Sequence, residues 1–464
     1  MKSLLFLLSL SCSVVALAGE TFVPTTDQTE LNVTIYNGSR ALVKDERRVP
    51  LKKGLNEVSF AGVSEQMMPQ TALLKGKGIS TLEQNFNFDL LTHSAMMKKS
   101  VGSEVSLEYI DPATGKITRD KGTLLSYNDG KPVLKIDDKI ETNYPGRVVF
   151  DKVPEQLRAE PTLTISVLSD NENTENLQLD YLTSGLTWKA DYVARVNADE
   201  TKMDLNGFVT LTNTSGANYK QAQLQLVAGD VNEVREYNVA PKVMMAMADG
   251  AVRRSARTEM AAEALADFYL YTLPHKTDIL SNQTKQVALL TGTDLGIKKT
   301  YELNEPFSVY SDEVKKMKPS IYVSFENTKE NKLGKPLPKG TIRLYKEDKN
   351  GRTQFVGEDR INHTAENEEV RLKTGTAFNL SADMKRTSFK KMGERTYRGA
   401  YEVTFKNGGD KEAVVDLTLY FPTNFKLFDE SQKGTRLNSN KVKWSISVPA
   451  KGKTTLTYKV QYEE

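Results

Sequence analysis

Cysteine and histidine are scarce in this chain of 464 residues. Its one cysteine, Cys12, lies in the N-terminal segment, so the rest of the chain has no disulfide, thiolate metal ligand or cysteine nucleophile. Its three histidines, His93, His275 and His363, show no His-x-x-x-His or His-Glu-x-x-His spacing. The sequence therefore predicts no preformed metal site and no cofactor, and each histidine is expected to be structural or exposed to solvent.

Recognisable catalytic motifs are absent as well. The chain has no Gly-x-Ser-x-Gly nucleophile elbow and no glycine-rich loop that would cradle a phosphate. Carboxylates are numerous, and two of them could meet in the fold for acid–base catalysis of the glycosidase type, but their spacing identifies no pair. We predict no catalytic residue and favour a non-catalytic role, while an enzymatic role stays open. The net charge of +3, with 27% charged residues, argues against a surface for nucleic acid.

Residues 1–18 have the pattern of a secretory signal peptide. Lys2 precedes an apolar run over residues 3–15, and Ala16-Leu17-Ala18 supplies the small residues of a cleavage site. Cleavage near Ala18 would place the mature protein outside the cytoplasm. The sequence thus predicts a periplasmic or secreted protein.

Long apolar runs are lacking in the rest of the chain. Because none approaches twenty residues, we expect no transmembrane helix in the mature protein. Ser9-Leu10-Ser11-Cys12 is faintly similar to a lipoprotein cleavage box. Lipid anchoring at Cys12 is therefore an alternative to cleavage after Ala18.

The dominant pattern that is present has a period of two. Leu31–Tyr36 alternates apolar and polar residues and is followed by an Asn37-Gly38 turn, which is typical of antiparallel strands. Similar runs recur to the C-terminus and predict an all-β, multidomain protein built from antiparallel, immunoglobulin-like β-sandwiches. The expected segments are a signal peptide (1–18), an N-terminal β domain (19–85), a small barrel-like segment (86–150), the first part of the main β-sandwich (151–235), an Ala/Met-rich loop or short helix (236–267), the second part of the main domain (268–390) and a C-terminal immunoglobulin-like sandwich (391–464).

The segment 101–150 differs from its surroundings because its strands are shorter and its turns tighter. Five short runs separated by turns such as Asp111-Pro112-Ala113-Thr114-Gly115 fit a small SH3-like or OB-like barrel. We expect this barrel to be inserted between strands of a larger domain. Residues 86–100, just before it, are expected to include a short helix.

The β pattern breaks in the Ala/Met-rich segment, residues 236–267. We expect a mobile loop with a short helix near residues 258–266. A segment that orders when it docks on a partner is a second interpretation. The third is a copper site with the thioethers of Met244, Met245 and Met247, although nothing else in the sequence supports a soft-metal site.

One candidate binding motif runs from Tyr181 to Tyr192 and contains Trp188, one of two tryptophans in the chain. Its structural interpretation is a strand–turn–strand corner around Gly185, with Trp188 in the core and Asp191 capping the turn. The alternative is an aromatic platform for a sugar ring or a peptide, which requires exposed rings. The candidate binding residues of this motif are Tyr181, Trp188, Asp191 and Tyr192.

A second candidate lies in two neighbouring stretches, 336–345 and 355–364. In the first, proline and glycine set a turn into a strand, and the second has a polar corner that precedes Ile361-Asn362-His363-Thr364. The structural interpretation is a salt-bridged loop, and the alternative is a ligand site in which His363 titrates. The candidate binding residues of this region are Glu358, Asp359, Arg360 and His363.

These motifs, in this order, carry a resemblance to a known family. Tyr181–Tyr192 is similar to the Y-x-x-x-G-x-x-W-x-x-x-Y signature of domain-of-unknown-function family 4139 (DUF4139), which is related to the mucoidy inhibitor A family. The runs 336–345, 357–364 and 372–378 resemble the same family. The resemblance covers roughly residues 160–464, and residues 32–74 look like the N-terminal partner domain of such proteins.

The resemblance implies an all-β, extracytoplasmic protein with no assigned reaction and no catalytic residues to carry over. The family name hints at an effect on exopolysaccharide production. Many relatives have a long coiled coil between the N-terminal and main domains, where this chain has the barrel-like segment. A role that depends on such a coiled coil is therefore in doubt here.

Together these features predict an exported, non-catalytic envelope protein that binds or scaffolds a protein or polysaccharide partner. The first alternative is a hydrolase of envelope carbohydrate whose carboxylates the sequence does not identify. A groove with two close carboxylates and exposed aromatic rings would favour that enzyme. The second alternative is a structural subunit of an extracellular layer or oligomer.

Overall fold

A computed structural model describes residues 19–154, 157–229, 260–265, 268–307, 314–422 and 424–463. The predicted signal peptide, Cys12 and the cleavage site lie outside these residues. The chain divides into two compact units. Unit 1 comprises Met1–Thr187, Thr212–Leu226 and His275–Lys285, and unit 2 comprises Trp188–Leu211, Val227–Pro274 and Gln286–Glu464. The described part of the chain contains no helix with the length and apolarity needed to cross a bilayer.

The described residues of unit 1 lie mostly in strands, with three short helical segments. The helical segments are η1 (Thr25–Asp27), η2 (Pro69–Thr71) and α1 (His93–Lys99). The strands are β1 (Thr21–Val23), β2 (Gln28–Tyr36), β3 (Arg40–Leu51), β4 (Gly54–Ala61), β5 (Leu73–Lys75), β6 (Ile79–Asn87), β7 (Glu104–Ile110), β8 (Ile117–Asn128), β9 (Lys131–Ile136), β10 (Lys139–Glu141), β11 (Arg147–Val149), β12 (Thr162–Ser169), β13 (Asn173–Ser184), β16 (Tyr219–Ala228) and β19 (Thr277–Ile279).

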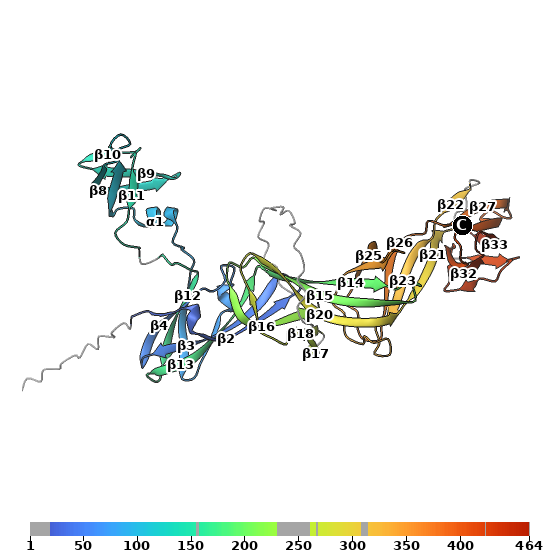
Figure 1. Cartoon of the computed structure of the whole chain (residues 1–464), viewed down its shortest axis with the longest axis horizontal. Coiled ribbons are helices and arrows are strands. Elements are labelled where there is room, and N and C mark those ends of the chain that lie inside the picture. The colour runs from blue at the N-terminus through green and yellow to red at the C-terminus, as the bar shows by residue number, and fades with distance from the viewer. Residues whose placement is uncertain are drawn as a thin grey trace, which may run out of the picture. The chain divides into compact units, whose positions relative to one another are not determined.

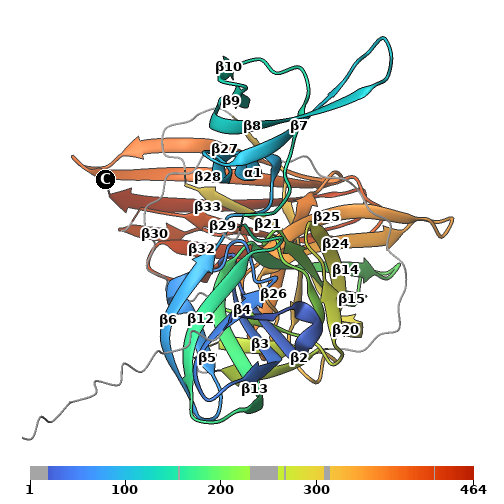
Figure 2. The ribbon, with the colours of Figure 1, turned by 90° about the vertical axis from the view of Figure 1, so that its left-hand side faces the viewer.

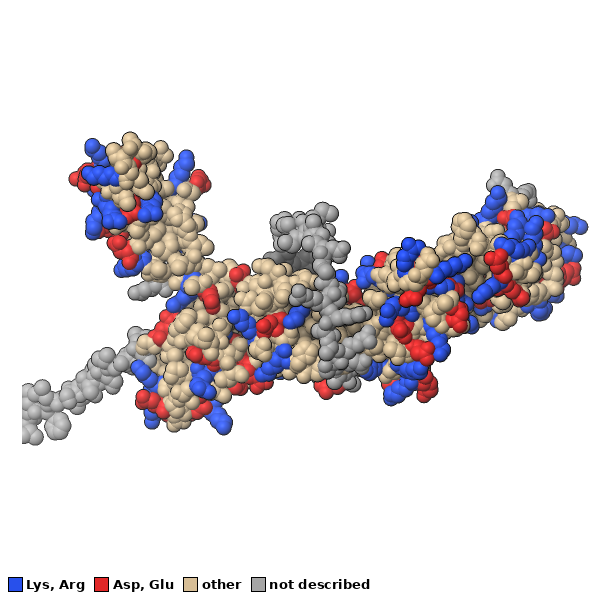
Figure 3. Space-filling view, viewed as in Figure 1, with Lys and Arg blue, Asp and Glu red and all other residues tan. Residues whose placement is uncertain are grey.

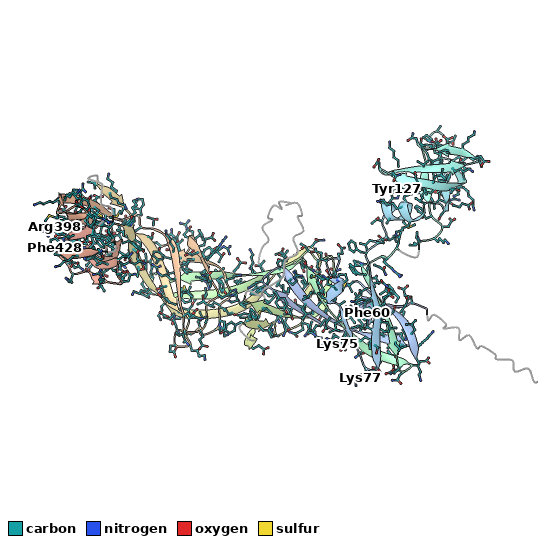
Figure 4. The ribbon with its side chains drawn as sticks, turned by 180° about the vertical axis from the view of Figure 1, so that it is seen from behind. Phe60, Lys75, Lys77, Tyr127, Arg398 and Phe428 are labelled. Atoms are coloured by element: carbon teal, nitrogen blue, oxygen red, sulfur yellow. The ribbon has the colours of Figure 1, made fainter. Side chains whose placement is uncertain are left out.

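Two sheets of unit 1 mix strands from distant parts of the sequence. One has the order β1-β4-β12-β6, and the other contains β16-β2-β3-β13-β5 with β19 beside β16. Figure 2 shows β4, β12 and β6 side by side. The segment 19–85, expected to be a β domain, thus shares both of its sheets with β12 and β13. Several of its apolar side chains, among them Val33, Val43 and Phe60 (Figure 4), are fully buried.

The barrel-like segment is an insertion in this unit. The chain leaves the sheet after β6 and returns at β12, which pairs with β6. Between them, α1 and the sheet β10-β9-β8-β7-β11 form a separate small body (Figure 1). Its core joins Met97 of α1 to Leu107, Leu124 and Leu134 of the strands. The helix begins where the Thr92 hydroxyl accepts the Ala95 N–H at 3.1 Å, an N-cap contact.

Unit 2 is also built of strands. They are β14 (Leu186–Val196), β15 (Lys202–Asn213), β17 (Ala261–Leu265), β18 (Phe268–Thr272), β20 (Gln283–Gly296), β21 (Lys298–Pro306), β22 (Lys315–Met317), β23 (Ser320–Glu326), β24 (Gly340–Glu347), β25 (Thr353–Ile361), β26 (Glu369–Thr376), β27 (Leu380–Lys391), β28 (Thr396–Asn407), β29 (Ala413–Tyr420), β30 (Phe425–Phe428), β31 (Thr435–Arg436), β32 (Lys441–Val448) and β33 (Lys453–Glu463).

The C-terminal part of unit 2 is a sandwich of two sheets. Their orders are β26-β23-β21-β29-β32-β31 and β22-β27-β28-β33-β30. One apolar core joins both sheets and includes the buried side chains of Trp444 and Phe405. The indole N–H of Trp444 donates to Glu430 Oε2 at 3.1 Å, so the buried ring keeps a polar partner. Arg398 covers the ring of Phe428 at the surface, 5.0 Å from its centroid (Figure 4).

The expected all-β class is confirmed, and two details differ from the expectations. Three of the described strand pairs, β1–β4, β14–β24 and β21–β29, are parallel. Alternation predicts a strand but not its direction, and parallel neighbours need long connections that a sequence does not reveal. Moreover, Ala261–Leu265, expected to lie in a short helix over about residues 258–266, form strand β17 against β18. Pairing with a neighbour outweighs the helix propensity of alanine.

In the rest of the Ala/Met-rich segment, residues 236–259 and 266–267 lie outside the described residues. This includes Met244, Met245 and Met247. The three interpretations of this segment therefore stay predictions.

On the face drawn in Figure 3, acidic and basic side chains are interspersed over both units rather than gathered by sign.

Candidate functional site

The two candidate motifs come together in one sheet of unit 2, with the order β20-β15-β14-β24-β25. We call it the motif sheet. In it, β14 runs parallel to β24, with Asp191 opposite Thr341. Strand β25 runs antiparallel to β24, with Glu358 opposite Arg343. Stretches far apart in the sequence are thus direct neighbours.

The two faces of β14 have different characters. Trp188, Tyr192 and the alanines between and after them point into the core, and Asp191 and Arg195 lie on the opposite, outer face. Arg343 and Tyr345 lie on the same outer face of β24, since Arg343 contacts Asp191. The outer face therefore carries the side chains that a partner could reach.

A chain of contacts crosses the outer face from β15 to β25. The Thr210 hydroxyl donates to Asp191 Oδ2 at 2.9 Å, and Arg343 Nη1 donates to Asp191 Oδ1 at 3.0 Å. Arg343 Nε also lies 3.2 Å from Glu358 Oε2. We call Thr210, Asp191, Arg343 and Glu358 the polar row. The hydrogen bond with Asp191 raises the pKa of Arg343, so the guanidinium stays charged.

Asp191 therefore has a different role from the expected one. It was expected to cap the turn at Gly185, but its carboxylate instead braces β14 against β15 and β24. The turn depends on the glycine itself. Gly185 has φ of +83°, and a Cβ there would lie 2.7 Å from Ser215 Cα.

The aromatic side chains of the first motif are closed off from solvent. Tyr181, Trp188 and Tyr192 are 2%, 7% and 0% exposed. Burial raises the pKa of Tyr181 and of Tyr192 well above the ordinary value. Since a platform for a sugar or peptide needs an exposed ring face, these rings do not provide one. Tyr181 lies in unit 1 and does not belong to the motif sheet.

Two buried tyrosines hold the proline-rich start of the second motif. The hydroxyl of Tyr192 donates to Pro338 O at 2.7 Å, and that of Tyr271 donates to Pro336 O at 3.0 Å. Tyr271 is mostly buried, which raises its pKa. The two motifs are thus also joined on the core side of the sheet.

His363 also contacts the loop that precedes β24. Its Nδ1 accepts the backbone N–H of Lys339 at 3.2 Å, so this nitrogen is unprotonated in the contact. Asn327 Nδ2 donates to Lys335 O and to Ala365 O, both at 2.8 Å, and ties the same region to β23. These contacts fix the shape of the loop and place His363 apart from the polar row.

Glu358, Asp359 and Arg360 were expected to lie with His363 in one salt-bridged loop or ligand site, but each has a separate role in the fold. Glu358 belongs to the polar row. The Asp359 carboxylate accepts the N–H of Arg360 at 2.8 Å and that of Lys373 at 2.7 Å, which joins β25 to β26. The Arg360 side chain is exposed. Gly357, with φ of +152°, allows a close approach, because a Cβ there would lie 2.3 Å from Thr374 O.

Several residues of this region were not among the sequence candidates, including Thr210, Arg343, Tyr271 and Asn327. Arg343 lay inside the quoted 336–345 run, and its alternation with Ile342 and Leu344 could have placed it on the polar face. No sequence pattern marks Tyr271 or Asn327, because each side chain donates to backbone carbonyls of another segment.

A cavity of about 480 Å³ opens at one end of the motif sheet. It is bounded by the end of β14, the start of β15, the end of β24 and the start of β25, with Asp294 from β20. Arg195 lies opposite Tyr345, and Tyr345 lies opposite Phe355. The two rings meet edge to face with centroids 5.7 Å apart, and Phe355 is 56% exposed.

Two carboxylates at this end of the sheet are each held between two lysines. Glu200 accepts from Lys299 at 2.7 Å and from Lys346 at 2.9 Å. Asp294 pairs with Lys332 at 2.8 Å and with Lys202 at 3.0 Å. These contacts fix Lys202 and Lys346 as parts of the cavity wall.

The same contacts keep both carboxylates ionised. Burial alone would raise the pKa of Glu200, but Lys299 and Lys346 outweigh it and the pKa is lowered. Hydrogen bonds from Lys332 and Lys202 lower the pKa of Asp294. A glycosidase acid needs a raised pKa, so these groups are suited to hold charge and accept hydrogen bonds. Within the described ranges, no three or more acidic or histidine side chains are grouped to hold a metal.

Comparison with known proteins bears on the motif sheet directly. The family model described as Domain of unknown function (DUF4139) matches residues 177–463, more than half of the chain. The match includes β14, β24 and β25, and it confirms the family that the motifs predicted. The relation to the mucoidy inhibitor A family stays a prediction. A search of the curated proteins found no match.

Proposed function

Because the chain belongs to the DUF4139 family, whose description assigns no function, we propose its function from the geometry of the motif sheet. The protein is an exported, non-catalytic binding protein of the cell envelope. It contacts a protein or polysaccharide partner through the outer face of the motif sheet, at the end where Arg195, Tyr345 and Phe355 lie. Export rests on the signal-peptide pattern of residues 1–18.

The observation that carries this proposal is the joining of the motifs into one braced surface. The polar row and the tyrosine contacts to the 336–338 loop immobilise β14, β24 and β25. An arginine and two aromatic rings remain at the end of this framework, and such residues supply much of the binding energy at interfaces. A surface that is already ordered pays less entropy when it binds.

The hydrolase alternative has weaker support. The cavity does combine carboxylates with an aromatic ring, that of Tyr345, as such an enzyme would require. However, Asp294 has a lowered pKa, and so does Asp348, whose carboxylate accepts the backbone N–H of Arg352 at 3.0 Å. Neither group is prepared to donate a proton to a leaving group near neutral pH.

Site-directed crosslinking would test the proposed surface. A photo-crosslinking residue would replace Phe355 in one sample and Leu437 in a matched control, because Leu437 is similarly exposed, at 53%. After irradiation in the native envelope, captured protein and glycan would be identified by mass spectrometry. We expect one molecule to be enriched from position 355 in repeated captures, and to be lost when Arg195→Ala is added.

Equal capture from both positions, or capture that Arg195→Ala leaves intact, would contradict the proposal. Release of shortened glycan during incubation with the purified protein would instead favour the hydrolase.

A further inference from the structure

We propose that the cavity at the end of the motif sheet binds an acidic sugar residue of a carbohydrate chain. This inference rests on the proposed function and names the chemical class of the partner. In it, Arg195 pairs with the sugar carboxylate, Tyr345 contacts the ring, and the charged wall of the cavity binds hydroxyl groups.

Arg195 is the cation at this cavity that is left for a ligand. Lys202 and Lys346 are engaged by Asp294 and Glu200. The side chain of Arg195 is exposed, and no carboxylate of the described residues lies within ion-pair distance of it. A guanidinium matches a carboxylate with two parallel hydrogen bonds, which gives both strength and orientation.

Tyr345 supplies an apolar surface beside that charge. It is the neighbour of Arg195 across the β14–β24 pair, and it is half-buried. Phe355 supports its ring from the other side in an edge-to-face contact. A sugar ring has C–H groups on its faces and hydroxyls around its edge, so a fixed aromatic ring can pack on one face.

The wall of the cavity is polar and already in place. Asp204 Oδ1 accepts the N–H of Asp294 at 2.9 Å, and Lys202 pairs with Asp294. Immobilised carboxylate oxygens and ammonium groups can accept from and donate to hydroxyls without further ordering. The volume of about 480 Å³ lies within the usual range for small-ligand sites.

This composition favours a carbohydrate over a protein as the occupant. An anchor side chain of a protein partner would bind best in an apolar pocket that excludes water. Here most side chains around the cavity are acidic, basic or amide-bearing, and Tyr345 is the one aromatic residue among them.

The test measures binding of a hexamer of α-1,4-linked galacturonic acid and of its fully methyl-esterified form by isothermal titration calorimetry, on the purified mature chain. The ester keeps the rings and hydroxyls but removes the charge. We expect the acidic hexamer to bind about tenfold more tightly than the ester, as a charge-assisted hydrogen bond would give.

Variants then assign the contacts. Arg195→Gln should lower the affinity for the acidic hexamer about tenfold and leave the ester unaffected. Tyr345→Ala should weaken both ligands, and Tyr345→Phe, which keeps the ring, should restore them. Arg360→Gln is the matched control, because Arg360 is an exposed arginine of the same sheet, opposite Thr341 and away from the cavity. Thermal unfolding would show that each variant is folded.

Three outcomes would overturn the inference. An equal loss with Arg360→Gln would indicate unspecific charge attraction, and equal affinities for acid and ester would remove the role of Arg195. Absence of binding to both hexamers would reject the cavity as a site for an acidic sugar. In that last case, capture of a protein from position 355 would still support the proposed binding function, so the two proposals can fail separately.

Discussion

Two arginine–aspartate pairs, one in each unit, have the same chemistry and different surroundings. In unit 1, Arg47 pairs with Asp45 at 2.6 Å, and their side chains are 1% and 4% exposed. In unit 2, Arg343 pairs with Asp191 at 3.0 Å, and their side chains are 36% and 11% exposed. The first pair is enclosed in the fold, whereas the second is at its surface.

The difference shows what each pair can do. Arg47 also donates to Val23 O at 2.7 Å and to Ala61 O at 2.8 Å, so its donors are used inside the unit and join β1 and β4 to β3. Arg343 instead distributes its donors along the outer face, to Asp191 and Glu358. A buried pair fixes a fold, and a half-exposed row fixes a surface that a partner can reach.

The largest effect is expected from breaking the buried pair. Arg47→Ala leaves the Asp45 carboxylate buried with only Gln28 Nε2 as a side-chain donor, at 2.7 Å. We expect the free energy of unfolding to fall by about 3–5 kcal/mol, because an uncompensated buried charge is costly. Chemical denaturation monitored by circular dichroism would measure it. A loss of unfolding free energy below about 1 kcal/mol would contradict the conclusion that Arg47 and Asp45 stabilise the fold.

Truncation of Trp188 should have an effect of nearly the same size. Its ring is 7% exposed and its indole N–H has no hydrogen-bond partner among the described residues, so its contribution comes from packing. Trp188→Ala should cost about 3–5 kcal/mol of unfolding free energy. A fully stable variant, measured in the same denaturation experiment, would show that this side chain is dispensable to the core and revive its role as a ligand platform.

A smaller effect is expected from the half-exposed pair. Arg343→Ala removes one charged hydrogen bond from Asp191 but leaves the Thr210 hydroxyl in place, so we expect a loss of about 1–2 kcal/mol. The amount of partner captured from position 355 should fall by a larger fraction than the unfolding free energy, because Arg343 no longer holds β14 and β24 in place. If stability fell as far as in Arg47→Ala, the contrast between the two pairs would be lost.

Acid should weaken the Glu200 contacts with Lys299 and Lys346. The folded state lowers the pKa of this carboxyl below its ordinary value of 4.5. The contribution is therefore complete above about pH 4.5 and is lost as the pH falls through the folded-state pKa. Solvent screening keeps it below about 1 kcal/mol. The stability difference between wild type and Glu200→Gln should shrink from pH 7 to pH 3, and a difference that grows would contradict this sign.

The smallest effect is expected at Lys189. Its Nζ lies 3.7 Å from Asp191 Oδ2, and its side chain is 59% exposed. Lys189→Ala should change the unfolding free energy by less than about 0.5 kcal/mol. A larger loss would mean that the polar row depends on Lys189 as well as on Arg343.

The sequence predicted the strands better than their arrangement. The five strands β7 to β11 could be predicted, because their short runs lie together in the sequence and their pairing is local. The parallel pairing of β14 with β24 was not, because their contact depends on a connection of more than a hundred residues. Of the site, the sequence predicted Trp188 as a core residue of a strand–turn–strand corner, but nothing local linked Asp191 to Arg343.

By itself, the sequence determined the all-β class, the family and the scarcity of residues for metal or thiol chemistry, since these depend on composition, period and local motifs. Tertiary structure decided which strands are neighbours, which rings are buried and which charges are paired. These properties arise from contacts between residues distant in the chain, and alternation places a side chain on a face without saying what covers it. On strand β14, alternation places Trp188 on the face that packs into the core and Arg195 on the opposite face, at the cavity.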